Sequence, residues 1–347
     1  MKEQIINIGS LSSISNLNYH LTKELKILRD SYLSGNDNTP IWDLRDLTPK
    51  KVSFSALTSF LAISKTIRDF IGQPIEIMAH WHPEFQGFLA DTDFLKISNE
   101  FDLYDWKGML GGYESNKTSP NTRIFYYSNI PQFHYTDQKK IIEWKDLKRE
   151  EIKRSVSFRL KPIFDNDYFN NQWNIELEAV FTTTISELVV NSLIHGRSTA
   201  FVGVQRTRKG ITTCVCDSGI GFLKSLEKYK PNLLESLKKS SLLAILYASF
   251  HSKNKIGLYR AISDVIQSGG YINISSFDSE ILWKSHIWNF IDQHENLDDV
   301  LKLELTNTDY YFNKYVDFDK LNKGYFKNYD HFLIGSRITF EIPFNNE

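Results

Sequence analysis

Short apolar runs alternate with amphipathic stretches through the first half of the chain, and this alternation restricts the folds open to it. Three of the runs have the length of buried strands: Ile5–Ile8, Ile41–Leu44 and Pro74–Trp81. Between the second and the third, the apolar residues of Ser55–Ile71 recur at helical spacing and stop at Gly72. Strands separated by helices predict a βαβ arrangement with a parallel or mixed sheet.

The length and charge of the chain narrow its class. With 347 residues it is long enough for two domains, each able to bury a core. A formal net charge of −1 gives no overall attraction to nucleic acid or to an anionic membrane. The N-terminal residues include Glu3 and no apolar run of the signal-peptide kind. We therefore expect a cytoplasmic protein without membrane contact.

A change in composition marks the expected domain boundary. The chain turns polar between Asn116 and Asn129, and a highly charged stretch follows at Gln138–Arg154. We place an N-terminal α/β domain at 1–150 and a second domain at 151–347. Acidic and basic residues interleave in the charged stretch, which favours a solvated helix or strand edge over a nucleic-acid contact.

Aromatic residues are concentrated in a segment of the second domain, between Phe277 and Ile334. They include Trp283, Trp288, Tyr310, Tyr311, Phe312, Tyr315 and Phe318. Because so many aromatic side chains are costly to expose to water, we expect a structured insertion or a partner surface.

The two cysteines, Cys214 and Cys216, lie on the same face of a predicted strand, about 7 Å apart. This spacing favours buried thiols over a disulfide.

A predicted helix at Trp173–His195 carries Glu187 and Asn191 on one face, because they are four residues apart. A carboxylate there can orient or deprotonate a water molecule, and an amide oxygen can complete the shell of a Mg²⁺ ion that holds phosphates. Taken alone, the pair is more typical of a solvated helix face.

Three further pieces follow in order. A predicted strand ends at Asp217 in the sequence DSGIG, where the carboxylate can accept a hydrogen bond from an exocyclic amine or simply cap a tight turn. Gly257 opens a predicted helix just after Lys253 and Lys255, which makes an anion site. Ser336 leads into the closing strand that ends near Pro343.

Together, ELVVNSLIHG, DSGIGF, KIGLYRAI and GSRITFEIP resemble the four ordered sequence boxes of the GHKL ATPase superfamily, over about residues 165–345. That family includes gyrase, histidine kinase and MutL-type ATP-binding domains. The resemblance implies a Bergerat α/β sandwich, in which helices cover one face of a mixed sheet, and hence an α+β fold overall. It also implies binding of ATP with Mg²⁺.

The resemblance gives each matching residue a role. Glu187 corresponds to the glutamate that polarises the attacking water, Asn191 to the asparagine that ligates Mg²⁺, and Asp217 to the aspartate that bonds the adenine amine. The remaining matches line the nucleotide site: Gly219 and Gly221 at the base, Gly257 and Leu258 under the phosphates, and Ser336 behind the adenine. Lys255 replaces the first glycine of the phosphate loop and adds a cation. Residues 222–256 correspond to the ATP lid.

The N-terminal half resembles a STAS module, the domain of anti-sigma antagonists, over IWDLRDLTPKKVSFSALTSFLAISKTI and PIEIMAHW. Ser53 and Ser55 lie where such modules carry a phosphorylatable serine, but the usual D-S-x-G pattern does not occur there. Helix N-cap serines are the favoured interpretation.

Three functions remain open at this stage. The first is an ATPase switch with slow hydrolysis in bacterial signalling or defence. The second is a serine protein kinase of the anti-sigma type acting on a STAS-like partner, and the third is an ATP sensor that is not an enzyme. The presence of both Glu187 and Asn191 favours an enzyme. A protein partner or a homodimer is expected through the N-terminal domain or the aromatic insertion.

Overall fold

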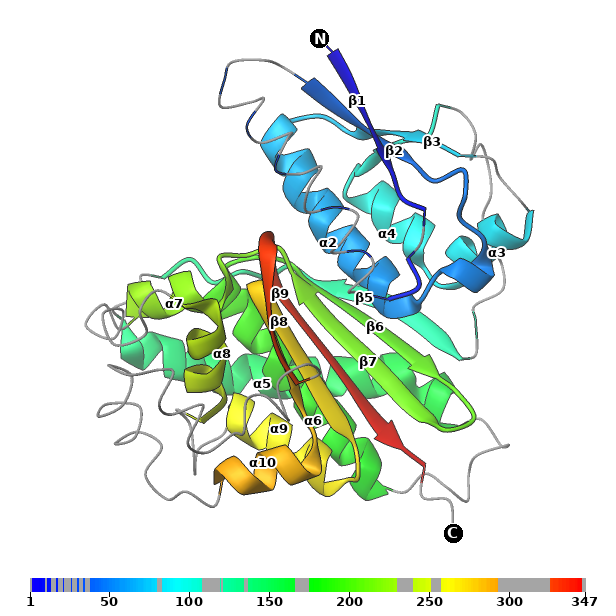
Figure 1. Ribbon diagram of the computed structural model, residues 1–347. Coiled ribbons are helices and arrows are strands. Elements are labelled where there is room, and N and C mark those ends of the chain that lie inside the picture. Colours follow the sequence, from blue (N-terminus) through cyan, green and yellow to red (C-terminus); the bar gives the residue numbers. More distant parts are fainter. Residues whose placement is uncertain are drawn as a thin grey trace.

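The computed structural model describes most of the chain, and every structural statement below concerns the described residues. They are 2–9, 11–13, 38–79, 83–107, 121–133, 137–165, 175–229, 240–250, 257–292 and 325–344, with 17, 21, 26, 30, 34 and 119 as single residues. They form two sheets, one parallel and one antiparallel, and several helices (Figure 1). The expected α+β class is confirmed.

The N-terminal half forms a four-stranded parallel sheet in the order β1-β2-β3-β4. Its strands are β1 (Lys2–Asn7), β2 (Asn38–Asp43), β3 (Ile75–Met78) and β4 (Tyr104–Asp105). Its helices are the 3-10 turn η1 (Pro49–Lys51), α2 (Phe54–Ile71), α3 (Pro83–Asp91) and α4 (Phe94–Glu100). The predicted alternation of strands and helices is confirmed from β2 to β4, and most residues between β1 and β2 lie outside the described residues.

Helix α2 begins and ends as the sequence predicts. The Ser53 hydroxyl accepts a hydrogen bond from the Ala56 amide at 3.2 Å, and Gly72 ends the helix in the left-handed conformation at a φ of 75°. The Ser55 hydroxyl lies 3.2 Å from that of Ser53. Ser53 is therefore a helix cap, as favoured above.

The second sheet has five strands in the order β5-β6-β7-β9-β8. They are β5 (Thr122–Tyr127), β6 (Ala200–Arg206), β7 (Gly210–Asp217), β8 (Tyr271–Trp283) and β9 (Phe326–Pro343). The helices of this half are α5 (Gln138–Phe164), α6 (Ile175–Asn191), α7 (Gly221–Tyr229), α8 (Ser241–Phe250), α9 (Leu258–Gln267) and α10 (Ser285–Asp292).

One feature of this sheet corrects the sequence prediction: we expected a mixed sheet, but every pairing between its described strands is antiparallel. The helices of this half lie on one face, as expected, since α5, α6, α8 and α9 share a core there. Helix α2 of the N-terminal half covers the other face, because β6 and β7 are apolar on both faces: Val202 and Val215 face one core, and Phe201 and Cys214 face the other.

The domain boundary also lies earlier than predicted. The chain changes sheet between Asp105 and Thr122, and the expected boundary near residue 150 falls inside α5. Strand β5 belongs to the second sheet because its residues alternate between the two cores: Phe125 faces the core of α5 and α6, and Ile124 faces the core of α2.

Helix α2 packs directly on β6 and β7 (Figure 1). A Cβ atom on Gly203 of β6 would lie 2.1 Å from the Thr58 hydroxyl oxygen and 2.9 Å from the Phe54 ring, so the strand needs a glycine there. The Ser59 hydroxyl lies 3.2 Å from the Cys216 sulfur. The core around α2 therefore contains side chains from both halves.

Both cysteines are free thiols without solvent exposure, as predicted. Burial raises the pKa of the Cys216 thiol well above its ordinary value. The thiol of Cys216 is therefore protonated at neutral pH, which fits a structural role at the interface with α2.

The aromatic insertion begins inside the core. Strand β8 continues to Trp283, and the rings of Trp283 and Trp288 lie 5.5 and 4.7 Å from the ring of Phe250 in α8. Tyr310, Tyr311, Phe312, Tyr315 and Phe318 lie outside the described residues.

The expected lid at 222–256 is not uniform. Its α8 is an apolar helix buried against β8, with Leu243, Ile245 and Leu246 in the core. Residues 230–239 and 251–256 lie outside the described residues. Within the described part, α8 is a core element of the second domain.

One described helical stretch, Ile175–Gly196, is apolar and long enough to cross a membrane by composition alone. However, 67% of that stretch is buried inside the structure, between the sheet and the neighbouring helices, which is typical of a core helix.

Candidate functional site

The end of β7 and the middle of β9 meet at Asp217. Ser336 is the register partner of Asp217, its hydroxyl donates a hydrogen bond to Oδ2, and its amide donates to Oδ1 at 3.3 Å. The Gly219 amide also donates to Oδ1, at 2.9 Å. Asp217 is only 1% exposed, and burial raises the pKa of its carboxyl, an effect that these hydrogen bonds partly offset.

Glycines enclose this carboxylate for a structural reason. A Cβ on Gly219 would lie 2.1 Å from the Gly196 carbonyl oxygen, and one on Gly335 would lie 2.0 Å from the Asp217 carbonyl oxygen. Gly335 also has a φ of +92°, a conformation that favours glycine. Backbone packing alone thus requires Gly219 and Gly335. The role of Gly219 and Gly221 at the nucleotide base stays a prediction.

Helix α6 carries the next two residues on one face. Glu187 is 3% exposed, and the Arg149 Nε of α5 donates to its Oε2 at 2.6 Å. Asn191 is half-buried one turn later, and its side chain makes no hydrogen bond within the described part of the chain.

Helix α6 continues into a π-helical turn at Ser192–Gly196, a distortion frequent at functional sites. Ser192 is a hydrogen-bond partner of the Asp217 carboxylate. A Cβ on Gly196 would lie only 3.1 Å from Asp217 Oδ1. The π-helical turn therefore joins the helix of Glu187 and Asn191 to the Asp217 cluster.

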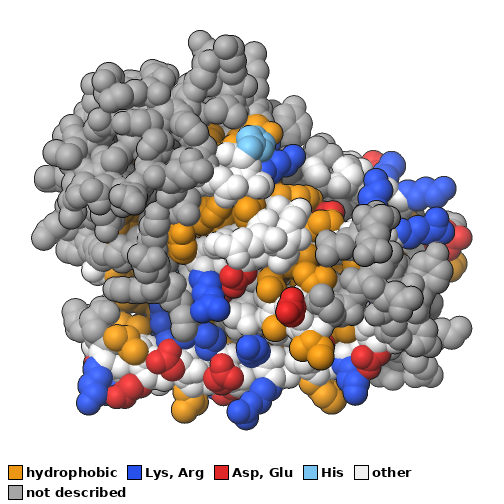
Figure 2. All heavy atoms as spheres, turned by 90° about the horizontal axis from the view of Figure 1, so that it is seen from below, with side chains coloured by type: hydrophobic (Ala, Val, Ile, Leu, Met, Phe, Trp, Pro, Cys, Tyr) orange, Lys and Arg blue, Asp and Glu red, His pale blue; other side chains and the backbone are white. Residues whose placement is uncertain are grey.

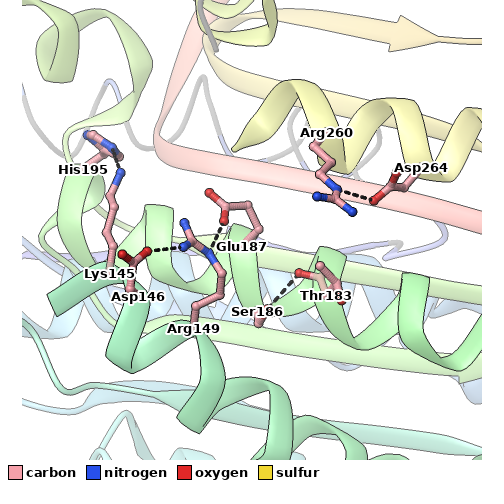
Figure 3. A network of polar contacts seen from close by, with 9 residues as sticks. All are labelled: Lys145, Asp146, Arg149, Thr183, Ser186, Glu187, His195, Arg260 and Asp264. Carbon is pink, nitrogen blue, oxygen red and sulfur yellow. Dashed lines mark hydrogen bonds and ion pairs between the residues drawn. The ribbon is translucent and has the colours of Figure 1, made fainter. Parts of the chain in front are cut away.

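Helix α5 supplies two cations that sequence reasoning missed (Figure 3). Besides the Arg149–Glu187 pair, Lys145 Nζ lies 3.0 Å from His195 Nε2, and His195 Nδ1 lies 3.4 Å from the Ser225 hydroxyl of α7. Burial lowers the pKa of the Lys145 ammonium. The outer side of α5 matches the solvated stretch we expected, with the exposed ion pair Lys139–Glu143.

The sequence did not predict an inward-facing side of α5, because acidic and basic residues alternate along this stretch. The only available signal was the four-residue spacing of Lys145 and Arg149, which places both on one side of a helix. Figure 2 shows acidic and basic side chains intermixed on the face seen from below, in keeping with a net charge of −1.

The second glycine box lies at the start of α9. Gly257 precedes the helix in an extended conformation, and Leu258 is buried in the core that α6 and α9 share. The first amides of such a helix have no partner within it and favour an anion. Lys253 and Lys255 lie outside the described residues. Figure 3 shows Arg260, on the same helix, turned toward Asp264, and their ion pair spans 3.5 Å.

The residues fit a magnesium ion only in part. The described residues contain no group of three or more His, Cys, Asp or Glu side chains placed to hold a metal. Mg²⁺ usually takes one or two protein oxygens and completes its shell with water and substrate phosphates. The amide of Asn191 suits such a partial shell. A groove of about 480 Å³ near Arg154, Phe158 and Glu178 lies farther along α5 and includes none of these residues.

Comparisons with known protein families, curated proteins and solved structures found no match for this chain. The functional assignment therefore depends on the four ordered sequence boxes and on the geometry of Asp217, Ser336, Glu187 and Asn191.

Proposed function

We propose that the chain binds ATP with Mg²⁺ through a GHKL-type domain of Bergerat fold and hydrolyses it slowly, as a conformational switch in bacterial signalling or defence. The observation that carries the proposal is the buried carboxylate of Asp217. It is held by Ser336 and Gly219 and joined through the π-helical turn to Glu187 and Asn191. Residues from separate sequence boxes thus meet within one small region.

Asp217 gives the site its preference for adenine. An ionised carboxylate has about four acceptor positions, and Ser336, Gly219 and Ser192 already occupy them, so the adenine amine takes the place of one of these donors. The exocyclic amine of adenine donates to such a position, whereas guanine offers a carbonyl oxygen there. Because Asp217 is closed to solvent, neighbouring groups must move aside as the base enters.

The phosphates lie near Asn191 and the start of α9. The free amides at Gly257 and Leu258 attract the phosphate oxygens, and the Asn191 oxygen is available to Mg²⁺. When bound, Mg²⁺ neutralises part of the negative charge of the phosphates.

Glu187 is the base of the proposed hydrolysis. Its Oε2 holds Arg149, and its Oε1 makes no hydrogen bond within the described part of the chain. Glu187 takes a proton from water while the water oxygen bonds to the γ-phosphorus. The bond from that phosphorus to the bridging oxygen breaks, which yields ADP and phosphate.

The fate of the γ-phosphate tests this proposal against its alternatives. The purified chain is incubated with γ-labelled ATP and Mg²⁺, alone and with a STAS-like partner protein. Release of label as free phosphate, with loss of release in Glu187→Gln, supports an ATPase. Label on a protein serine indicates a kinase, and label that stays on bound ATP indicates a sensor. Either of these outcomes contradicts the hydrolytic function.

A further inference from the structure

Two cations of α5 lie on either side of Asn191. Helices α5 and α6 pack against each other, with Lys145 against His195 and Arg149 against Glu187. The helices thus run antiparallel, and Asn191 is four residues from each contact point on α6 and its π-helical turn. A ligand group held at Asn191 therefore lies between the ammonium of Lys145 and the guanidinium of Arg149.

The two cations are unequally balanced by acidic groups. Arg149 contacts two carboxylates, Glu187 at 2.6 Å and Asp146 at 2.8 Å. Lys145 Nζ lies within hydrogen-bond distance of the His195 imidazole, and within the described part of the chain it forms no ion pair with a carboxylate. Lys145 is half-buried, and the acidic groups that act on it through space, Glu187 and Asp146, are both paired with Arg149, so an arriving anion gives the ammonium a direct ionic contact that it does not have among the described residues.

We propose that Lys145 and Arg149 hold the terminal phosphate of the bound nucleotide, and that Arg149 exchanges Glu187 for this phosphate when ATP binds. The inference rests on the proposed function, since it names the protein groups that recognise the γ-phosphate. Lys145 acts as a point charge, and the planar guanidinium of Arg149 can donate two parallel hydrogen bonds to phosphate oxygens.

This exchange makes catalysis depend on the γ-phosphate. With ADP, Arg149 keeps its bond to Glu187 Oε2 and the carboxylate stays occupied. With ATP, the phosphate takes over Arg149, and both Glu187 oxygens become available to the attacking water. His195 contacts both Lys145 and Ser225 of α7. Binding of the γ-phosphate at Lys145 therefore also affects α7, the helix that follows β7.

Calorimetry on the full chain tests the inference. A non-hydrolysable ATP analogue and ADP, each with Mg²⁺, are titrated into the wild type, Lys145→Met and Arg149→Gln. Lys139→Ala, on the exposed side of the same helix, is the matched control. Each of the two variants should bind the analogue about 10- to 100-fold more weakly, the effect of losing a charged hydrogen bond. Affinity for ADP should change less than about threefold, and Lys139→Ala should match the wild type.

Further variants separate recognition from folding. Arg149→Lys retains a cation and should recover part of the lost analogue affinity. If Arg149→Gln is poorly folded because Glu187 loses its partner, the double variant Glu187→Gln/Arg149→Gln removes both buried charges and gives the same measurement.

The outcomes distinguish the two proposals. If the two variants lose equal affinity for ADP and for the analogue, or lose none for either, Lys145 and Arg149 do not hold the terminal phosphate. The proposed function is still upheld in that case, provided that the wild type binds the nucleotide. A wild type that binds neither nucleotide overturns both.

Discussion

Ser336 lies opposite Asp217 in the β7–β9 ladder, and its hydroxyl donates a hydrogen bond to the Asp217 carboxylate. The two residues are 119 positions apart in the sequence, and both are buried. This contact fixes the orientation of a carboxylate that burial makes costly to ionise. Two separate sequence boxes therefore depend on each other in the folded chain.

Ser336→Ala should lower the free energy of unfolding by about 1 to 3 kcal/mol, because a buried carboxylate oxygen loses its hydroxyl donor. Urea denaturation at pH 7 measures the change. Ser336→Thr keeps the hydroxyl and should retain most of the stability. An alanine variant as stable as the wild type would mean that the hydrogen bond contributes nothing.

The buried Asp217 should make stability depend on pH. Its folded pKa lies above the unfolded value of about 3.9, so the unfolded chain loses its proton first as pH rises. This group therefore lowers stability progressively from about pH 4 up to its folded pKa, and the loss remains at higher pH. Relative to the wild type, Asp217→Asn should become more stable between pH 4 and pH 7 in urea denaturation. A difference that stays constant across this range would show that burial does not disfavour the ionised carboxyl.

Glu187→Gln should reduce ATP turnover by about 100- to 10,000-fold and leave nucleotide affinity nearly unchanged, because a base acts chiefly in the transition state. Glutamine still offers Arg149 an acceptor. Glu187→Ala should also lose about 1 to 3 kcal/mol of stability, since the largely buried Arg149 loses one of its two carboxylate partners and keeps only Asp146. Asn191→Ala should weaken Mg-ATP binding itself. Wild-type turnover in Glu187→Gln would remove the residue from catalysis and favour a sensor.

The contact between α2 and β6 can be tested at Gly203. Gly203→Ala places a methyl group 2.1 Å from the Thr58 hydroxyl oxygen and should cost about 1 to 3 kcal/mol through overpacking. In the double variant with Thr58→Ala, part of this cost should be recovered, which a double-mutant cycle in thermal denaturation measures. Strict additivity of the two changes would argue against direct packing between the halves.

The sequence predicted the parts of the structure that follow from local patterns. Helix α2, from its Ser53 cap to Gly72, and strand β7 ending at Asp217 are read directly from periodicity and from cap and turn residues. The order of the boxes also predicted that Asp217 and Ser336 would belong to one site, and the strand register brings them into contact.

The rest required tertiary packing that a sequence pattern does not contain. The charges of α5 alternate in sign along the chain, yet packing on α6 turns Lys145 and Arg149 inward. Strand β5 lies in a polar stretch that we assigned to the N-terminal domain, and its pairing with β6 assigns it to the second sheet. Likewise, the sequence predicted helices at 222–256, but it did not show whether they form a lid or, as α8 does, part of the core.

The most direct test of the account is a calorimetric titration of the wild type with ATP and with GTP, each in the presence of Mg²⁺. We predict binding of ATP and a preference over GTP. In Asp217→Asn, we expect a loss of about 1 to 3 kcal/mol in ATP binding, because a neutral amide is a weaker acceptor for the adenine amine. Equal affinity for ATP and GTP, or binding of neither, would contradict the assignment of Asp217 to the adenine and with it the proposed function.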